Sequence, residues 1–157
     1  MRVWMLVAFL VVLLDQFSKW WVRELFELYE AFPLLPGLQF IYVRNLGAAF
    51  SFLSSAGGWQ RWFFIVLSLL ASIAIMIWIY RLPKQRRLEA LGLSLVLGGA
   101  VGNLVDRVLL GYVVDFIDVY YRSWHWPVFN VADSAITVGV AVMIIDIIFY
   151  QRHELSE

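Results

Sequence analysis

Cysteine is absent from this 157-residue sequence, and histidine occurs only twice, as His125 and His153. The lack of thiols excludes disulfide bonds, thiol catalysis and cysteine-ligated zinc. Two histidines also leave little material for a metal site. The formal net charge is zero, so the chain lacks the basic surface by which many proteins bind nucleic acids, and we expect no nucleic-acid partner.

Charge of either sign is scarce. Charged residues make up 15% of the chain and hydrophobic residues 62%, whereas soluble domains contain about 25% charged and about 50% apolar residues. A membrane-spanning helix needs about 20 mostly apolar residues. Four stretches meet this requirement, at about 3–21, 62–80, 88–108 and 131–150. We therefore predict a mainly α membrane protein with four transmembrane helices, formed by one polytopic domain over residues 1–157.

The first apolar stretch has the start of a cleavable signal peptide, because Arg2 precedes it. However, no small-x-small cleavage site follows. The stretch ends instead in Trp20 and Trp21, which suit a membrane interface. We expect a retained helix.

The most basic segment of the chain is 81–87 (Arg-Leu-Pro-Lys-Gln-Arg-Arg). Basic loops of membrane proteins stay on the cytoplasmic side, so we place this connection there. With four spans, both termini then lie on the same side. The longer connections, about 22–61 and 109–130, face outward.

These two outward connections are rich in residues that favour strands. Residues 38–43 (Leu-Gln-Phe-Ile-Tyr-Val) form one strand pattern, and Gly47 separates it from residues 48–53, which predicts a hairpin. Residues 112–121 are rich in Val, Ile, Phe and Tyr and predict another strand. We expect a small sheet, accompanied by a short helical segment, on the outer membrane surface.

Polar residues interrupt the outward end of the first span. A charge at the bilayer centre costs from about 2.5 to more than about 10 kcal/mol, so such residues need a partner or a function. Asp15 and Lys19 are four residues apart, and they share one helix face. Two interpretations stand equally: a self-neutralising pair at the interface, with Lys19 extending outward, or a contribution to a functional site.

Two further polar clusters lie at the ends of the third and fourth spans. Asn103 and Arg107 share one helix face, and Asp106 has Arg107 or an outer-loop group as its expected partner. Asn130 is a good N-cap with Asp133 three residues later, which by itself favours a capping box over a site.

Three other aspartates need an explanation. Asp115 lies between Val114 and Phe116 in the predicted strand, where nothing nearby in sequence explains a carboxylate. Asp118 should face the other side of that strand, and we expect it to be solvated. Asp146 is near the cytoplasmic end of the last span, so we interpret it as structural.

The polar residues limit the chemistry. The chain lacks the His-Glu-x-x-His motif of zinc proteases, and neither histidine lies in a span where a serine protease would need one. Paired aspartates hydrolyse peptides by sharing one proton, with one carboxylate as general base.

A transporter or an assembly scaffold is the competing interpretation, although the polar residues of a transporter are expected near the midplane, often with inverted repeats. A presenilin-like protease would carry Gly-x-Gly-Asp, which residues 111–115 do not match.

Five segments resemble, in the same order, the motifs of the lipoprotein signal peptidase family, also called signal peptidase II. The resemblance spans nearly the whole chain. The segments are 15–19 (Asp-Gln-Phe-Ser-Lys), 44–51 (Arg-Asn-Leu-Gly-Ala-Ala-Phe-Ser), 98–107 (Gly-Gly-Ala-Val-Gly-Asn-Leu-Val-Asp-Arg), 114–116 (Val-Asp-Phe) and 129–134 (Phe-Asn-Val-Ala-Asp-Ser).

The resemblance implies that Asp115 and Asp133 form a catalytic dyad. It also implies that seven residues bind substrate or support the site, namely Asp15, Lys19, Asn45, Gly47, Asn103, Arg107 and Asn130. The implied reaction removes the signal peptide of a prolipoprotein just before its diacylglyceryl-modified cysteine, at the periplasmic face of a bacterial inner membrane. The family uses no metal or organic cofactor, and globomycin-type cyclic peptides inhibit it. We expect a monomer surrounded by membrane lipids.

Overall fold

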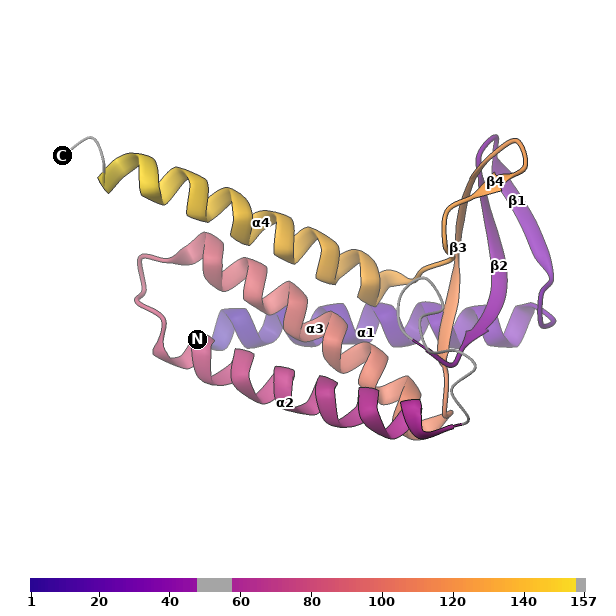
Figure 1. Ribbon diagram of the computed structural model, residues 1–157, viewed down its shortest axis with the longest axis horizontal. Coiled ribbons are helices and arrows are strands. Elements are labelled where there is room, and N and C mark those ends of the chain that lie inside the picture. The colour runs from indigo at the N-terminus through magenta and orange to yellow at the C-terminus, as the bar shows by residue number, and fades with distance from the viewer. Residues whose placement is uncertain (48–57, 155–157) are drawn as a thin grey trace.

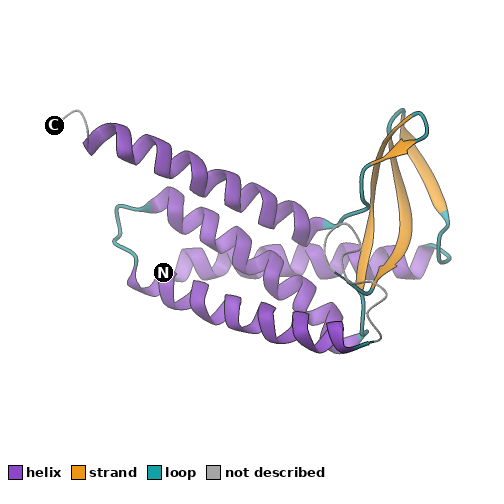
Figure 2. Ribbon diagram, in the orientation of Figure 1, coloured by secondary structure: helices purple, strands orange, loops and turns teal. Residues whose placement is uncertain are grey.

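The computed structural model describes residues 1–47 and 58–154 (Figure 1). The helices form a bundle and the strands form a small sheet beside it (Figure 2). Along the chain, two pairs of strands stand between the helices. The elements are α1 (Arg2–Leu25), β1 (Ala31–Leu35), β2 (Leu38–Asn45), α2 (Trp59–Arg81), α3 (Arg87–Leu109), β3 (Val113–Tyr121), β4 (Trp124–His125) and α4 (Val131–Glu154).

The four predicted spans are confirmed as helices, and each helix includes its predicted range. All four are long and apolar enough to cross a membrane. Helix α3 is central: it packs against α1, α2 and α4, and half of its apolar span is buried, compared with 17–22% for the other three. The exposed apolar side chains of α1, α2 and α4 are those expected to face lipid.

Glycines allow α3 and α4 to approach closely. A Cβ atom added to Gly99 would collide with the backbone oxygen of Ala132, and Gly92 and Gly139 lie against each other's backbone oxygens. Small residues at such positions let membrane helices pack backbone to backbone. The packing brings the first turn of α4, with Asp133, against the polar end of α3.

The sheet lies at one end of the helix bundle (Figure 2). Its strands are antiparallel in the order β1-β2-β3-β4, which confirms the strand prediction for 38–43 and for most of 112–121. The partners of β2 are β1 and β3. The predicted pairing with residues 48–53 lies outside the described residues. The expected short helix is absent from 26–47 and 110–130, the described parts of the connections beyond the helices.

Two short connections join the sheet to the bundle near Asp115. Gly111, at a φ of 86°, makes the turn from α3 into β3, in a conformation that favours glycine. At the other end, Phe129 pairs with Ile117 in β3. Its amide donates to the oxygen of Ile117 at 3.1 Å and its oxygen accepts from Ile117 at 2.8 Å. Asn130 and the start of α4 are thereby held beside the middle of β3.

Candidate active site

A cavity of about 520 Å³ opens where the sheet meets the bundle. It contains Asp115 from β3 and Asp133 from α4, which are 18 residues apart in sequence but face the same space. Most of its surface is apolar, although polar and apolar residues are equally numerous in the lining, and apolar surface with placed polar groups is typical of small-molecule sites. The lining residues are Asn45, Asn103, Arg107, Val113, Asp115, Trp126, Pro127, Val128, Phe129, Asp133, Ser134, Ile136, Thr137 and Val138.

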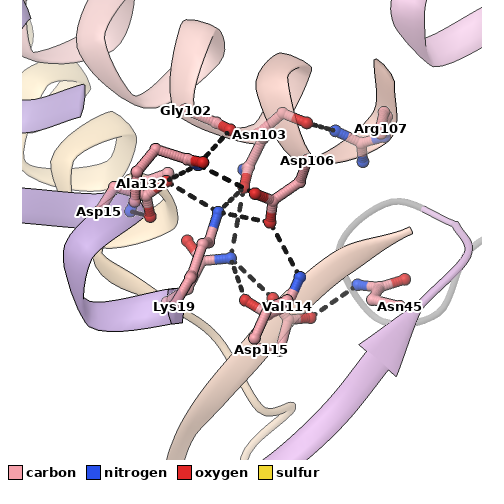
Figure 3. Close-up of polar contacts among 12 residues, drawn as sticks. Asp15, Lys19, Asn45, Gly102, Asn103, Asp106, Arg107, Val114, Asp115 and Ala132 are labelled. Atoms are coloured by element: carbon pink, nitrogen blue, oxygen red, sulfur yellow. Dashed lines mark hydrogen bonds and ion pairs between the residues drawn. The ribbon is translucent and has the colours of Figure 1, made fainter. Parts of the chain in front are cut away.

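Two asparagine amides hold the Asp115 carboxylate. Asn45 donates its Nδ2 to Oδ2 at 2.8 Å, and Asn130 donates its Nδ2 to Oδ1 at 2.7 Å (Figure 3). Asp115 is only 2% exposed. Burial, followed by the negative charge of Asp133, raises the pKa of Asp115 to about 7, although the two amide donors oppose this rise. Asp115 therefore exchanges its proton near neutral pH.

Asp133 combines a capping contact with a contact to another helix. Its backbone N–H donates to Asn130 Oδ1 at 2.9 Å, and its Oδ2 accepts from the Asn130 backbone N–H at 3.3 Å. This reciprocal pair is the predicted capping box. Its Oδ1 accepts from Asn103 Nδ2 at 2.8 Å. Asn130 thus contacts both cavity aspartates, through its side chain and its backbone.

Lys19 is buried beneath the cavity and bridges two supporting carboxylates. Its Nζ lies 2.8 Å from Asp15 Oδ2, 3.0 Å from Asp106 Oδ2 and 2.9 Å from Asn103 Oδ1. These three acceptors match the three N–H groups of an ammonium. The bond to Asn103 Oδ1 also orients that amide, so that its Nδ2 faces Asp133.

The same two carboxylates accept the backbone N–H that directly precedes each cavity aspartate. Asp15 Oδ1 accepts from the N–H of Ala132 at 2.9 Å, and Asp106 Oδ2 accepts from the N–H of Val114 at 3.0 Å (Figure 3). Because Lys19 joins Asp15 to Asp106, the group links the two segments that carry Asp115 and Asp133. We call Asp15, Lys19 and Asp106 the brace.

Arg107 and Gly47 orient the Asn45 side chain. Arg107 Nη2 donates to the backbone oxygen of Gly47 at 2.9 Å, and the Gly47 N–H donates to Asn45 Oδ1 at 2.9 Å. With its oxygen occupied in this way, Asn45 turns its NH₂ group toward Asp115. Arg107 also lies 5.1 Å above the Phe64 ring, so the guanidinium is packed as well as hydrogen-bonded.

The family model described as signal peptidase (SPase) II matches residues 7–149. This chain belongs to the signal peptidase II family. It is therefore a peptidase of the membrane, as the sequence motifs predicted.

Individual relatives agree with the family assignment. The lipoprotein signal peptidase of Acinetobacter baumannii is 47% identical over 150 residues, which cover 96% of this chain and 85% of the relative. That of Shewanella pealeana is 52% identical over 143 residues, covering 91% and 84%. A solved structure described as a bacterial membrane enzyme, determined by the in meso method at 2.3 Å, superposes with a TM-score of 0.85 at 33% identity, covering 94% of this chain and 88% of that one.

The structure brings all nine predicted site residues of this family member to the cavity or to the network beneath it. Five of the nine line the cavity, and the other four contact these five directly or through one another. The lining residues among the nine are Asn45, Asn103, Arg107, Asp115 and Asp133, and those behind them are Asp15, Lys19, Gly47 and Asn130. Residues 48–51 of the second motif lie outside the described residues.

Of the two partners expected for Asp106, the outer-loop group is confirmed as the Val114 N–H, and Arg107 is wrong. Asp106 faces α1 and β3, where Lys19 and the Val114 N–H contact it, rather than Arg107. Sequence reasoning also passed over Gln16, whose Nε2 donates to Gly102 O at 3.1 Å and to Asp106 Oδ1 at 2.9 Å. The spacing of Gln16 and Lys19, three residues apart on α1, was the signal that both reach α3.

The two remaining aspartates lie away from the cavity. Asp118 is 2% exposed, so the expectation of a solvated residue is wrong: it accepts from Gln39 Nε2 at 2.6 Å and lies 2.8 Å from His125 Nδ1. These partners replace water. Asp146 pairs with Arg86 at 2.7 Å, in agreement with a structural role.

Proposed function

We propose that the protein is an aspartic endopeptidase that removes signal peptides from diacylglyceryl-modified prolipoproteins, cutting just before the lipidated cysteine. The observation that carries this proposal is the meeting of Asp115 and Asp133, from separate elements, around Asn130 in one largely apolar cavity. The names of the two relatives, lipoprotein signal peptidases, support the substrate class.

The two carboxyl groups divide the work of hydrolysis. Asp115 holds the shared proton, since its pKa is raised to about 7, and Asp133 acts as the general base. Asp133 removes a proton from water as the water oxygen attacks the scissile carbonyl carbon, while Asp115 gives its proton to the carbonyl oxygen. The tetrahedral intermediate then breaks its C–N bond, the amine takes the proton from Asp133, and Asp115 recovers its own proton from the hydroxyl group.

The surroundings of the dyad fit an amphiphilic substrate. Phe129, Ile136 and Val138 line the cavity from the connection to α4 and from α4 itself, and Val138 is 52% exposed on the lipid-facing side of the helix. The signal peptide is an apolar segment that enters from the membrane. The lipid on the cysteine fixes the scissile bond at the level of the headgroups, where the ends of α3 and α4 meet the sheet.

Location and partners follow from the same geometry. The basic 81–87 connection lies at the end of the bundle opposite the sheet (Figure 1), so we place the dyad near the periplasmic face of a bacterial inner membrane and both termini in the cytoplasm. A site complete within one four-helix unit needs no second copy, so we propose a monomer. Globomycin-type cyclic peptides would occupy the same cavity.

The experiment is cleavage of a purified prolipoprotein, with and without the diacylglyceryl group, followed by mass measurement of both products. The proposal predicts one cut before the modified cysteine and little or no cutting of the unmodified form. Equal cleavage of both forms would show that the enzyme does not recognise the lipid. A cut elsewhere would contradict the proposed cleavage position.

A further inference from the structure

A second cavity lies at the end of the bundle opposite the sheet, between the first turn of α1 and the connection from α2 to α3. Its volume is about 540 Å³, within the range of about 300–1,000 Å³ for sites of small molecules. Apolar walls come from Val3, Trp4 and Ile79, and basic side chains lie in the connection. This cavity has no part in the proposed reaction.

The charge of this cavity is of one sign. Among its described lining residues, Lys84, Arg86 and Arg87 are basic and none is acidic. Arg86 is paired, with Glu89 at 2.8 Å and Asp146 at 2.7 Å. Lys84 and Arg87 are exposed, and no carboxylate of the described residues forms an ion pair with either of them. Within the described part of the chain, two positive charges at the cavity are therefore without an ion pair.

One of these two cations, Arg87, lies at an unfavourable position for its helix. Arg86 is the N-cap of α3 and Arg87 its first residue, whereas the N-terminal end of a helix dipole favours negative charge. A bound anion would pair with Lys84 and Arg87. Glu89, the acidic residue in the first turn of α3, pairs with Arg86, and the first turn of α1 has no acidic side chain.

Apolar surface continues from the cavity along the helices. Trp4 packs on the core that joins α1, α2 and α3. Outside this core, Val3 and Leu6 of α1 are 64% and 54% exposed, and Met76 and Tyr80 of α2 are 43% and 72% exposed. The site thus places cations at the membrane surface and apolar side chains deeper, which is the arrangement of a phosphate group joined to acyl chains.

We propose that this cavity binds the headgroup of an anionic phospholipid, with Lys84 and Arg87 on the phosphate and the acyl chains against α1 and α2. The apolar walls favour a lipid over free phosphate. No carboxylate is among the described lining residues, and the carboxylates of Glu89 and Asp146 pair with Arg86, which favours an anionic headgroup over a zwitterionic one.

The test is native mass spectrometry of the full-length protein in neutral detergent, titrated with phosphatidylglycerol and, separately, with phosphatidylcholine. The cavity variant is Lys84→Gln/Arg87→Gln. The matched control, Arg2→Gln/Arg81→Gln, removes the same charge from exposed residues at the same end of the bundle but outside the cavity. Circular dichroism checks that both variants keep the helical content of the wild type.

The proposal predicts saturable binding of phosphatidylglycerol that is tighter than that of phosphatidylcholine. Removal of each cation should weaken it about fivefold, or about 30-fold for the double variant, with a clearly smaller loss in the control. Equal losses in the two variants would mean diffuse attraction without a site and would overturn the proposal. Displacement by equimolar glycerol phosphate, or equal binding of the two lipids, would overturn it as well.

Discussion

Asp115 is the residue whose ionisation should control the rate. Its pKa is raised to about 7 by burial and by the charge of Asp133, and the proposed mechanism needs its proton. The protonated form is present below the raised pKa and is lost as the pH rises through it. We therefore predict that kcat/KM falls above about pH 7, toward a tenfold loss for each pH unit, in initial rates measured from pH 6 to 9.

Removal of the Asn45 amide should shift the pH at which kcat/KM begins to fall. Its hydrogen bond favours the ionised carboxylate of Asp115 and lowers that pKa. In Asn45→Ala the fall in rate should therefore begin at a higher pH. The assignment of the proton to Asp115 would be contradicted if kcat/KM of the wild type stayed constant to pH 9. It would also be contradicted if kcat/KM of the variant began to fall at a lower pH than that of the wild type.

At the scale of residues, the motifs predicted which residues form the site better than they predicted the partners of each side chain. Asp115 was singled out because a carboxylate between two apolar strand residues has no local explanation, and the structure places it in the cavity. The contact of Asp106 with Lys19 and that of Asp118 with His125 could not be inferred, because these pairs meet only through helix packing and strand pairing. The capping interpretation of Asp133 was correct as geometry and incomplete as a description of its contacts.

At the scale of elements, the brace holds α1, β3 and the start of α4 in register. Lys19 and Asp15 are 2% and 0% exposed, so Lys19→Met would leave Asp15 and Asp106 as neighbouring buried carboxylates without a cation. Breaking a buried ion pair in this way costs about 3–5 kcal/mol. We expect a strongly lowered melting temperature in detergent, measured by intrinsic fluorescence.

A neutral brace and an exposed lysine give the controls. The triple variant Asp15→Asn/Lys19→Met/Asp106→Asn has no buried charge but keeps oxygen acceptors for the N–H groups of Ala132 and Val114, so it should recover much of the stability. Lys84→Met, at the only other lysine of the chain, should melt like the wild type. An unchanged melting temperature in Lys19→Met would contradict the brace.

The elements themselves were predictable to different degrees. Spans of about 20 apolar residues are an unambiguous signal, and all four were found with ends within four residues of the structure. The strand pattern at 38–43 was equally clear, yet its partners were not, because pairing depends on where β1 and β3 lie rather than on the strand itself. The weak pattern of β1, which contains Pro33, gave no signal of a strand.

At the scale of the whole molecule, orientation is open to a direct test because the chain has no cysteine. Leu35→Cys places a thiol on the sheet, at a position 62% exposed, and Gln85→Cys places one in the exposed basic connection. A membrane-impermeant maleimide should label Leu35→Cys in intact spheroplasts and Gln85→Cys only after lysis. The opposite pattern would place the dyad on the cytoplasmic side.

The catalytic dyad is the central claim, and single-turnover cleavage of a lipidated prolipoprotein by Asp115→Asn, Asp133→Asn and Asp118→Asn tests it most directly. Asp118 is the matched control, since it is buried in the same strand but does not line the cavity. With folding verified by circular dichroism, we predict losses of at least about 100-fold to 10,000-fold for the first two variants and near wild-type cleavage for Asp118→Asn. Wild-type rates in a folded Asp115→Asn or Asp133→Asn variant would show that these carboxylates are structural and that the proposed mechanism is wrong.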